Sequence, residues 1–141
     1  MSNINPLNAY RETNIKTASQ GKLIIMLYDG AVRNMETAVS GLSSENPKFD
    51  KVNNAILKAQ DIITELMVSL DFERGGEIAN NLYNLYIFFN KELMQANVQK
   101  DKEMITPVIK MMKDLRSAWI QVFNKTSAGA NRMSAGVNVA G

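Results

Sequence analysis

Hydrophobic side chains recur along most of the chain at spacings of three and four residues, the period that places them on one side of an α-helix. One stretch begins near residues 17–19 and reaches about Gly41, the second runs from Pro47 to Leu70, the third follows Gly76 to about Val98, and the fourth follows Asp101 and ends near residues 123–124. Helices of these lengths joined by short links predict an all-α protein, an antiparallel up-down-up-down four-helix bundle.

Capping residues set the expected helix starts. Asn46 and Pro47 suit the N-cap and first helical position of the second helix, and Asp101 suits the N-cap of the last. For the first helix, Thr17 and Gln20 have the spacing of a capping box, with Ser19 as a competing N-cap. These signals place the bundle at residues 19–124, behind an N-terminal arm of residues 1–18.

Glycine and proline mark the other expected boundaries. Residues 71–76 predict a tight turn, because Gly75 and Gly76 are free to take the positive φ that a chain reversal often needs. Pro107 lies inside the last helix, so we expect a kink there or a true start at Thr106. Residues 125–141, rich in Gly, Ala, Ser and Asn, predict a flexible C-terminal tail.

Each predicted helix has one apolar stripe for the core. The expected core residues are Leu23, Leu27, Ala31 and Ala38; Val52, Ala55, Ala59, Ile63, Leu66 and Leu70; Ile78, Leu82, Leu85, Tyr86, Phe89 and Leu93; and Met104, Val108, Met111, Leu115, Trp119 and Val122. A second set lies roughly 100° to 160° further round each helix, where a bundle normally carries charge. This set is Ile25, Tyr28, Val32 and Val39; Leu57, Thr64 and Val68; Tyr83, Ile87, Met94 and Val98; and Ile109 and Ile120, with Phe88 on the other flank.

The second stripes have three interpretations. They are the shoulders of a wide core, or a dimer interface, or the walls of two apolar grooves on opposite sides of the bundle that bind another protein. We predict these residues as partner-binding positions. Leu7 and Tyr10 join them, because their spacing places both on one side of a short helix that would dock in a groove; the alternative is a solvated terminus.

Composition removes most other functions. The chain has no His and no Cys, which excludes His and thiolate metal sites, catalytic triads that need those residues, and disulfides. Carboxylates alone are the remaining catalytic candidates, at Glu36, Asp61, Glu65, Glu77 and Glu92, and they suit an ordinary solvated face. Gly75 and Gly76 lack the Lys-Ser/Thr context of a phosphate loop. We therefore expect no catalytic, cofactor or metal site.

Charge and hydropathy limit the partners. A formal charge of +2 is too balanced for a nucleic-acid binder, and the longest apolar run, of six residues, is too short for a membrane span or signal peptide. We expect a cytoplasmic chain without membrane insertion, a monomer or weak dimer when free. A homo-oligomeric structural bundle that uses the same stripes on itself remains the alternative.

Several runs resemble a known family. They are Ala9-Tyr10, Thr17-Ala18-Ser19, Leu23-Ile24, Met26 to Ala31, Ile62, Glu65-Leu66, Leu70-Asp71, Gly75 to Ala79, Asn81-Leu82, Leu85-Tyr86, Leu93, Ala96-Asn97, Leu115-Arg116 and Ala118-Trp119. In this order and spacing the chain resembles FliS, the flagellin-specific export chaperones. Two positions depart from the family pattern: Gln20 stands where Pro is usual, and Pro107 interrupts a helix that is generally continuous.

The resemblance implies a four-helix bundle that binds the C-terminal, helix-forming segment of flagellin in the cytoplasm. It implies that the chaperone prevents premature polymerisation and helps delivery to the flagellar type III export apparatus. It also implies that the arm around Tyr10 covers the client site and contacts the flagellar export gate protein.

Overall fold

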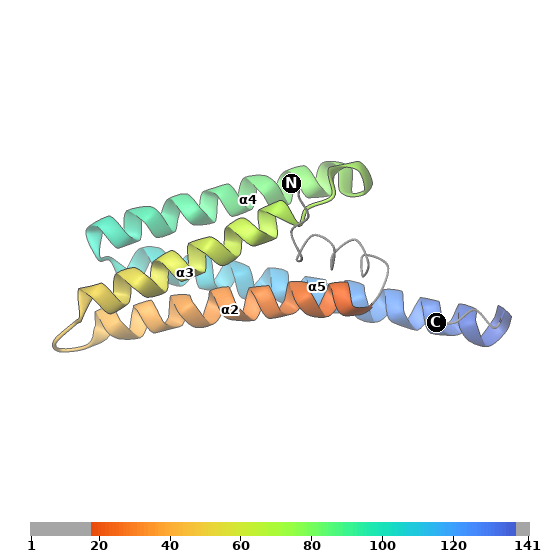
Figure 1. Ribbon diagram of the computed structural model, residues 1–141, viewed down its shortest axis with the longest axis horizontal. Coiled ribbons are helices and arrows are strands. Elements are labelled where there is room, and N and C mark those ends of the chain that lie inside the picture. Colours follow the sequence, from red (N-terminus) through yellow and green to blue (C-terminus); the bar gives the residue numbers. More distant parts are fainter. Residues whose placement is uncertain (1–17, 138–141) are drawn as a thin grey trace, which may run out of the picture. The chain divides into compact units, whose positions relative to one another are not determined.

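The computed structural model describes the backbone of residues 18–137 and the side chains of residues 20–125. Its order is α2 (Ala18–Ser43), α3 (Phe49–Val68), α4 (Phe72–Gln99) and α5 (Lys102–Val137), and the described backbone holds no strand (Figure 1). The predicted all-α, four-helix class is confirmed. The chain divides into two compact units, Leu27–Asp114 and Met1–Met26 with Leu115–Gly141.

The unit of residues 27–114 is an antiparallel bundle that contains parts of all four helices. In α2 and α3, a Cβ on Gly41 would lie 2.8 Å from Val52 Cγ2, and one on Gly30 would lie 3.1 Å from Ile62 Cδ1. Between α2 and α5, Lys102 Nζ donates to Ser43 Oγ at 3.0 Å, and Lys113 Nζ lies 3.1 Å from Glu36 Oε2. In both α3 and α5, the number of the contacting residue falls as the number along α2 rises, so each of these helices runs antiparallel to α2, as the up-down arrangement predicts.

Large apolar side chains fill the centre of this unit. The most completely buried are Tyr28, Met35, Val52, Ile56, Ile63, Leu66, Tyr86, Phe89, Leu93, Ile105, Val108 and Met112. The hydroxyls of Tyr28 and Tyr86 lie 2.6 Å apart in a buried hydrogen bond, with their rings edge to face. The pair lets two phenols enter an apolar core without losing hydrogen bonding.

The other unit contains the first turns of α2 and the C-terminal part of α5. Trp119 and Phe123 stack with ring centroids 5.3 Å apart, and a Cβ on Gly21 would come within 3.0 Å of the Phe123 ring. Gly21 is therefore the residue that lets α2 approach this ring closely. Val122, expected in the core, is half exposed, which corrects its prediction.

The start of α3 differs from the prediction. The N-cap is Lys48, whose extended backbone accepts hydrogen bonds from the amides of Lys51 and Val52, and no side chain caps this end. Asn46 lies in the preceding link, where its amide donates to Ser44 Oγ at 3.3 Å. The predicted N-cap at Asn46 is wrong because the local turn uses this residue instead.

The last helix begins as predicted and ends later. Asp101 Oδ1 accepts from the Glu103 amide at 2.9 Å, and α5 continues through Pro107, so the alternative start at Thr106 is wrong. The expected end near residues 123–124 is also wrong, because α5 reaches Val137. The segment 125–137 contains no Pro, the residue that breaks a helix most strongly, although Gly129 and Gly136 are poor helix formers. Residues 1–17 and 138–141 lie outside the described backbone.

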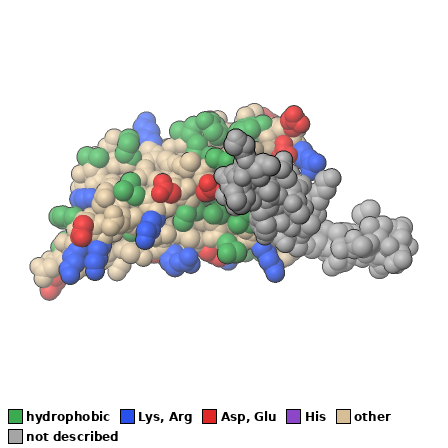
Figure 2. All heavy atoms as spheres, in the orientation of Figure 1, with side chains coloured by type: hydrophobic (Ala, Val, Ile, Leu, Met, Phe, Trp, Pro, Cys, Tyr) green, Lys and Arg blue, Asp and Glu red, His purple; other side chains and the backbone are tan. Residues whose placement is uncertain are grey.

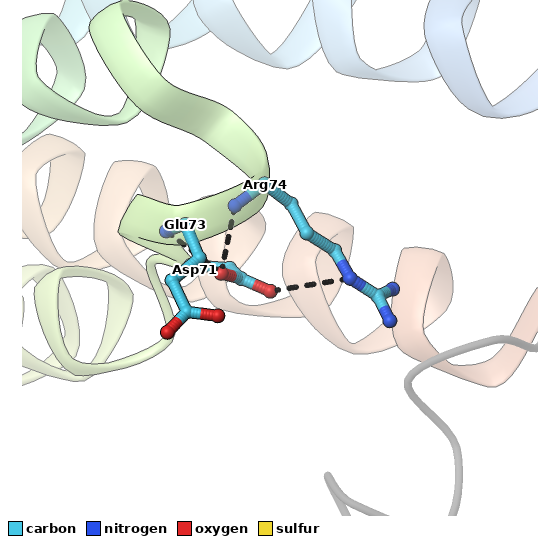
Figure 3. A network of polar contacts seen from close by, with 3 residues as sticks. All are labelled: Asp71, Glu73 and Arg74. Carbon is cyan, nitrogen blue, oxygen red and sulfur yellow. Dashed lines mark hydrogen bonds and ion pairs between the residues drawn. The ribbon is translucent and has the colours of Figure 1, made fainter.

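Most of the turn predicted at residues 71–76 is the first turn of α4, with Asp71 as its N-cap. Asp71 Oδ1 accepts from the amides of Glu73 and Arg74 at 3.1 Å each, and Asp71 Oδ2 lies 3.7 Å from Arg74 Nε (Figure 3). Gly76 then leaves the helical conformation with φ 50° and ψ −120°, and α4 resumes after this kink. The predicted positive φ is confirmed at Gly76. Ile78, expected in the core, lies just after the kink and is exposed.

Candidate functional site

Exposed hydrophobic side chains concentrate on α3 and α4. Ten of the twelve large hydrophobic residues that are exposed among the described side chains belong to these two helices. The core of residues 27–114 is filled without them. Figure 2 shows hydrophobic side chains interrupting the polar surface over this part of the molecule. Such a concentration on a monomer is typical of a protein-binding surface.

Three hydrogen bonds between α3 and α4, here called the polar rungs, hold the two helices side by side. Asn97 Nδ2 donates to Asn53 Oδ1 at 2.7 Å near one end. Near the middle, Gln60 Nε2 donates to the Asn90 carbonyl at 3.0 Å, and Asn90 Nδ2 donates to Thr64 Oγ1 at 3.3 Å. These bonds fix the antiparallel register of the two helices.

The register pairs the second stripes of α3 and α4. Counting from the rungs, Leu57 lies at the level of Met94, and Val68 lies at the level of Tyr83. We call these residues the α3–α4 face: Leu57, Thr64, Val68, Tyr83, Ile87, Met94 and Val98. All seven are exposed, up to 75 % for Val98. From Tyr83 to Val98 the face is about 22 Å long at ~1.5 Å per residue, the length of four helical turns.

An aromatic residue closes each end of the face. At the Val68 end, the rings of Phe72 and Tyr83 meet edge to face with centroids 5.9 Å apart. At the Val98 end, Lys100 Nζ lies 5.9 Å from the centre of the Phe49 ring. Both aromatic residues are exposed, so they extend the apolar surface beyond the seven residues of the face.

Lys100 is held in place by the end of α4. It has the left-handed backbone conformation that usually selects glycine, with φ 54° and ψ 45°, and it ends the helix. Its ammonium donates to the Asn97 side-chain oxygen, next to the Asn53 rung. The Val98 end of the face is thus fixed by the helix cap and by the polar rung together.

The other predicted stripe, on α2 and α5, is largely hidden. Tyr28 and Val32 are buried, which corrects their predicted outward placement: they belong to the core. Ile25, Ile109 and Ile120 are half-buried, and so is Val39. The shoulder interpretation therefore describes these residues better than a second open groove. Leu7 and Tyr10 lie outside the described residues, so their partner-binding role stays a prediction.

Sequence reasoning missed the polar rungs. The residues Asn53, Gln60, Asn90 and Asn97 were not part of either stripe, yet they define how the face is built. A signal was present in the spacing: both 53–57–60–64 and 83–87–90–94 step by four, three and four, mixing amides with apolar residues. That pattern marks an interhelical seam with its own polar contacts.

Metal binding and membrane crossing find no support among the described residues. Among them, no group of three or more His, Cys, Asp or Glu side chains is arranged to hold a metal ion. None of the described helices combines the length and the apolar character that crossing a membrane requires. What the described surface does offer is an apolar face about four turns long, suited to another helix.

Comparison with known proteins identifies the family of the chain. A family model described as "Flagellar protein FliS" matches residues 3–126. The chain belongs to the FliS family. It is 33 % identical over 117 residues to the flagellar secretion chaperone FliS of Bacillus subtilis (strain 168), covering 83 % of this chain and 85 % of that one. It is 36 % identical over 122 residues to the FliS chaperone of Salmonella typhimurium (strain LT2), covering 86 % and 89 %.

A third relative is matched over more of its length. The chain is 33 % identical over 124 residues to the FliS of Campylobacter jejuni (serotype O:6), covering 88 % of this chain and 95 % of that one. The resemblance drawn from the sequence is therefore confirmed. FliS membership gives this chain a chaperone role in flagellar export, and the family is one of chaperones, not of enzymes.

Proposed function

We propose that this FliS chain binds the C-terminal, helix-forming segment of flagellin on the α3–α4 face. In the cytoplasm it keeps the segment from polymerising prematurely and assists its delivery to the flagellar type III export apparatus. One observation supports this proposal above others: seven residues in a four-turn row are exposed, although the core is complete without them. The relatives are named flagellar secretion chaperones, which supports a client of flagellar secretion, and the family resemblance implies that this client is flagellin.

The mechanism is coupled folding and binding. An extended segment that becomes helical on a surface loses conformational entropy, which costs about 2 to 5 kcal/mol. The burial of its apolar side chains on the face offsets this cost. Apolar burial makes the complex tight enough to protect the client, and the ordering cost leaves it weak enough for release at the export gate. The arm residues Leu7 and Tyr10 compete for the same face, and contact the gate protein after release.

Calorimetry tests the proposal. The full chain is titrated with a peptide of the flagellin C-terminal segment at several temperatures and salt concentrations, with a scrambled peptide as the control. We expect one-to-one binding, a large negative heat-capacity change and mild overall salt dependence, because apolar burial drives the association. No binding, or binding with a small heat-capacity change and steep salt dependence, would contradict the proposal.

The alternative function is a homo-oligomeric bundle that uses the α3–α4 face on a second copy. The exposed apolar row supports this candidate as well, since a two-fold dimer buries the same patch on both subunits. Light scattering separates the two. A monomer that forms a one-to-one complex with the peptide supports the chaperone, whereas a stable dimer indifferent to the peptide supports the oligomer.

A further inference from the structure

Two opposite charges lie in the middle of the α3–α4 face. Asp61 falls between Leu57 and Val68 on α3, in a row that steps by four, three and four residues. Lys91 falls between Ile87 and Val98 on α4, in a row with the same steps. Each charge therefore belongs to the edge of an otherwise apolar row, where an occupant of the face would meet it.

The two charges lie at the same level of the seam. Gln60 and Asn90 are hydrogen-bonded across it, and Asp61 and Lys91 are the next residues along their helices. The apolar stripe of each helix places Asp61 on the outer edge of α3 and Lys91 on the outer edge of α4. The face thus has an acidic edge and a basic edge, opposite each other halfway along its length.

Neither charge is neutralised within the described part of the chain. Asp61 and Lys91 are both exposed, and neither makes an ion pair with another described residue. Other charges have partners: Lys113 lies 3.1 Å from Glu36, and Lys110 lies 3.3 Å from Asp114. The two edges of the face therefore present opposite charges to whatever docks between them.

We propose that the α3–α4 face receives an amphipathic α-helix with a basic residue over Asp61 and an acidic residue over Lys91, and that this pair sets the direction of the docked helix. The inference rests on the proposed function for the identity of the helix. Reversing an amphipathic helix on the same face exchanges its two edges. Each edge charge would then face a charge of its own sign, which disfavours the reversed orientation.

The affinity test uses the full chain and the flagellin C-terminal peptide. The variants Asp61→Lys and Lys91→Glu are compared with Arg33→Glu on α2 and Glu45→Lys in the α2–α3 link, which reverse exposed charges away from the face. We expect each edge reversal to weaken binding by about three- to tenfold at low ionic strength, since an exposed attraction becomes a repulsion. The loss should shrink at high salt, and the two controls should bind like the unchanged chain.

The direction test uses cross-linking. The chain contains no Cys, so a single Asn80→Cys near the Tyr83 end, or Gln99→Cys near the Val98 end, gives a unique thiol. A peptide with a thiol-reactive group at its N-terminus should link to one of the two positions in the unchanged background. In the charge-exchanged background Asp61→Lys with Lys91→Asp, the preference should move toward the other position.

The outcomes separate the two proposals. If the unchanged chain does not bind the peptide, the proposed function fails. If it binds, and the edge reversals behave like the controls or both thiols link equally, the proposed function stands and the charge inference is overturned. Circular dichroism of every variant checks that the bundle is intact, which surface charge changes at exposed helical positions should preserve.

Discussion

Ile87→Asp isolates the contribution of the α3–α4 face to client binding. Ile87 is 42 % exposed, so a partner can bury at most that share of its surface. Full burial of such a side chain is worth about 1.5 to 3 kcal/mol, which gives about 0.6 to 1.3 kcal/mol for this residue. Placing an unpaired carboxylate in the same contact adds a desolvation cost, and the sum of at least about 2 kcal/mol corresponds to about a 30-fold rise in Kd.

Phe88→Asp is the matched control for this prediction. Phe88 is also 42 % exposed and is the next residue of α4, but it lies on the opposite flank. Titration calorimetry with the flagellin peptide measures Kd, and urea unfolding measures stability. Both variants should lose a similar unfolding free energy, about 1 to 2 kcal/mol, because each side chain is covered to the same extent by the chain itself, so only Kd should separate them. Equal loss of affinity in the two variants, or none in Ile87→Asp, would refute the assignment of the face.

Three further predictions concern stability and the arm. Gly76→Ala should lower the unfolding free energy by about 1 to 3 kcal/mol, because the positive φ at this position strains any residue with a side chain. The cause would be the backbone alone, since nothing lies within 4 Å of the added Cβ. An unchanged urea midpoint would show that the kink is dispensable. Tyr28→Phe and Tyr86→Phe should each lower the unfolding free energy by about 1 kcal/mol. The double variant should lose less than the sum, because both changes remove the same buried hydrogen bond. Strict additivity in a double-mutant cycle would count against that coupling. Deletion of residues 1–16 should leave helicity unchanged and raise the client association rate in stopped flow, since a competing segment is gone, whereas an unaltered rate would retire the competition.

The sequence pattern predicts the bundle well because its signal is repeated in every helix. Ala59, Ile63 and Leu66 fall on the core stripe of α3, and all three are buried. Errors appear where a local contact overrides the pattern. Ile78 has the core phase, but the Gly76 kink precedes it and it is exposed.

The sequence predicted the outer apolar positions of the candidate site, but not which of them are exposed. Periodicity identifies an outer apolar position, but it does not tell an open surface from the shoulder of a core. Leu57 and Tyr28 have the same kind of phase, and one is exposed while the other is buried. The difference depends on which helices are neighbours and how closely they approach, as at Gly41 and Val52, and this is a property of the packed structure.

The amide rungs of the α3–α4 seam have a consequence for the chaperone before any client arrives. Sliding one helix by a turn would separate Asn53 from Asn97 and Gln60 from the Asn90 carbonyl, leaving amides unpaired, whereas a purely hydrocarbon seam would tolerate the slip. The α3–α4 face therefore keeps its shape whether or not it is occupied. Under the proposed function, a client segment would meet a rigid template, and only the competing arm would have to move aside.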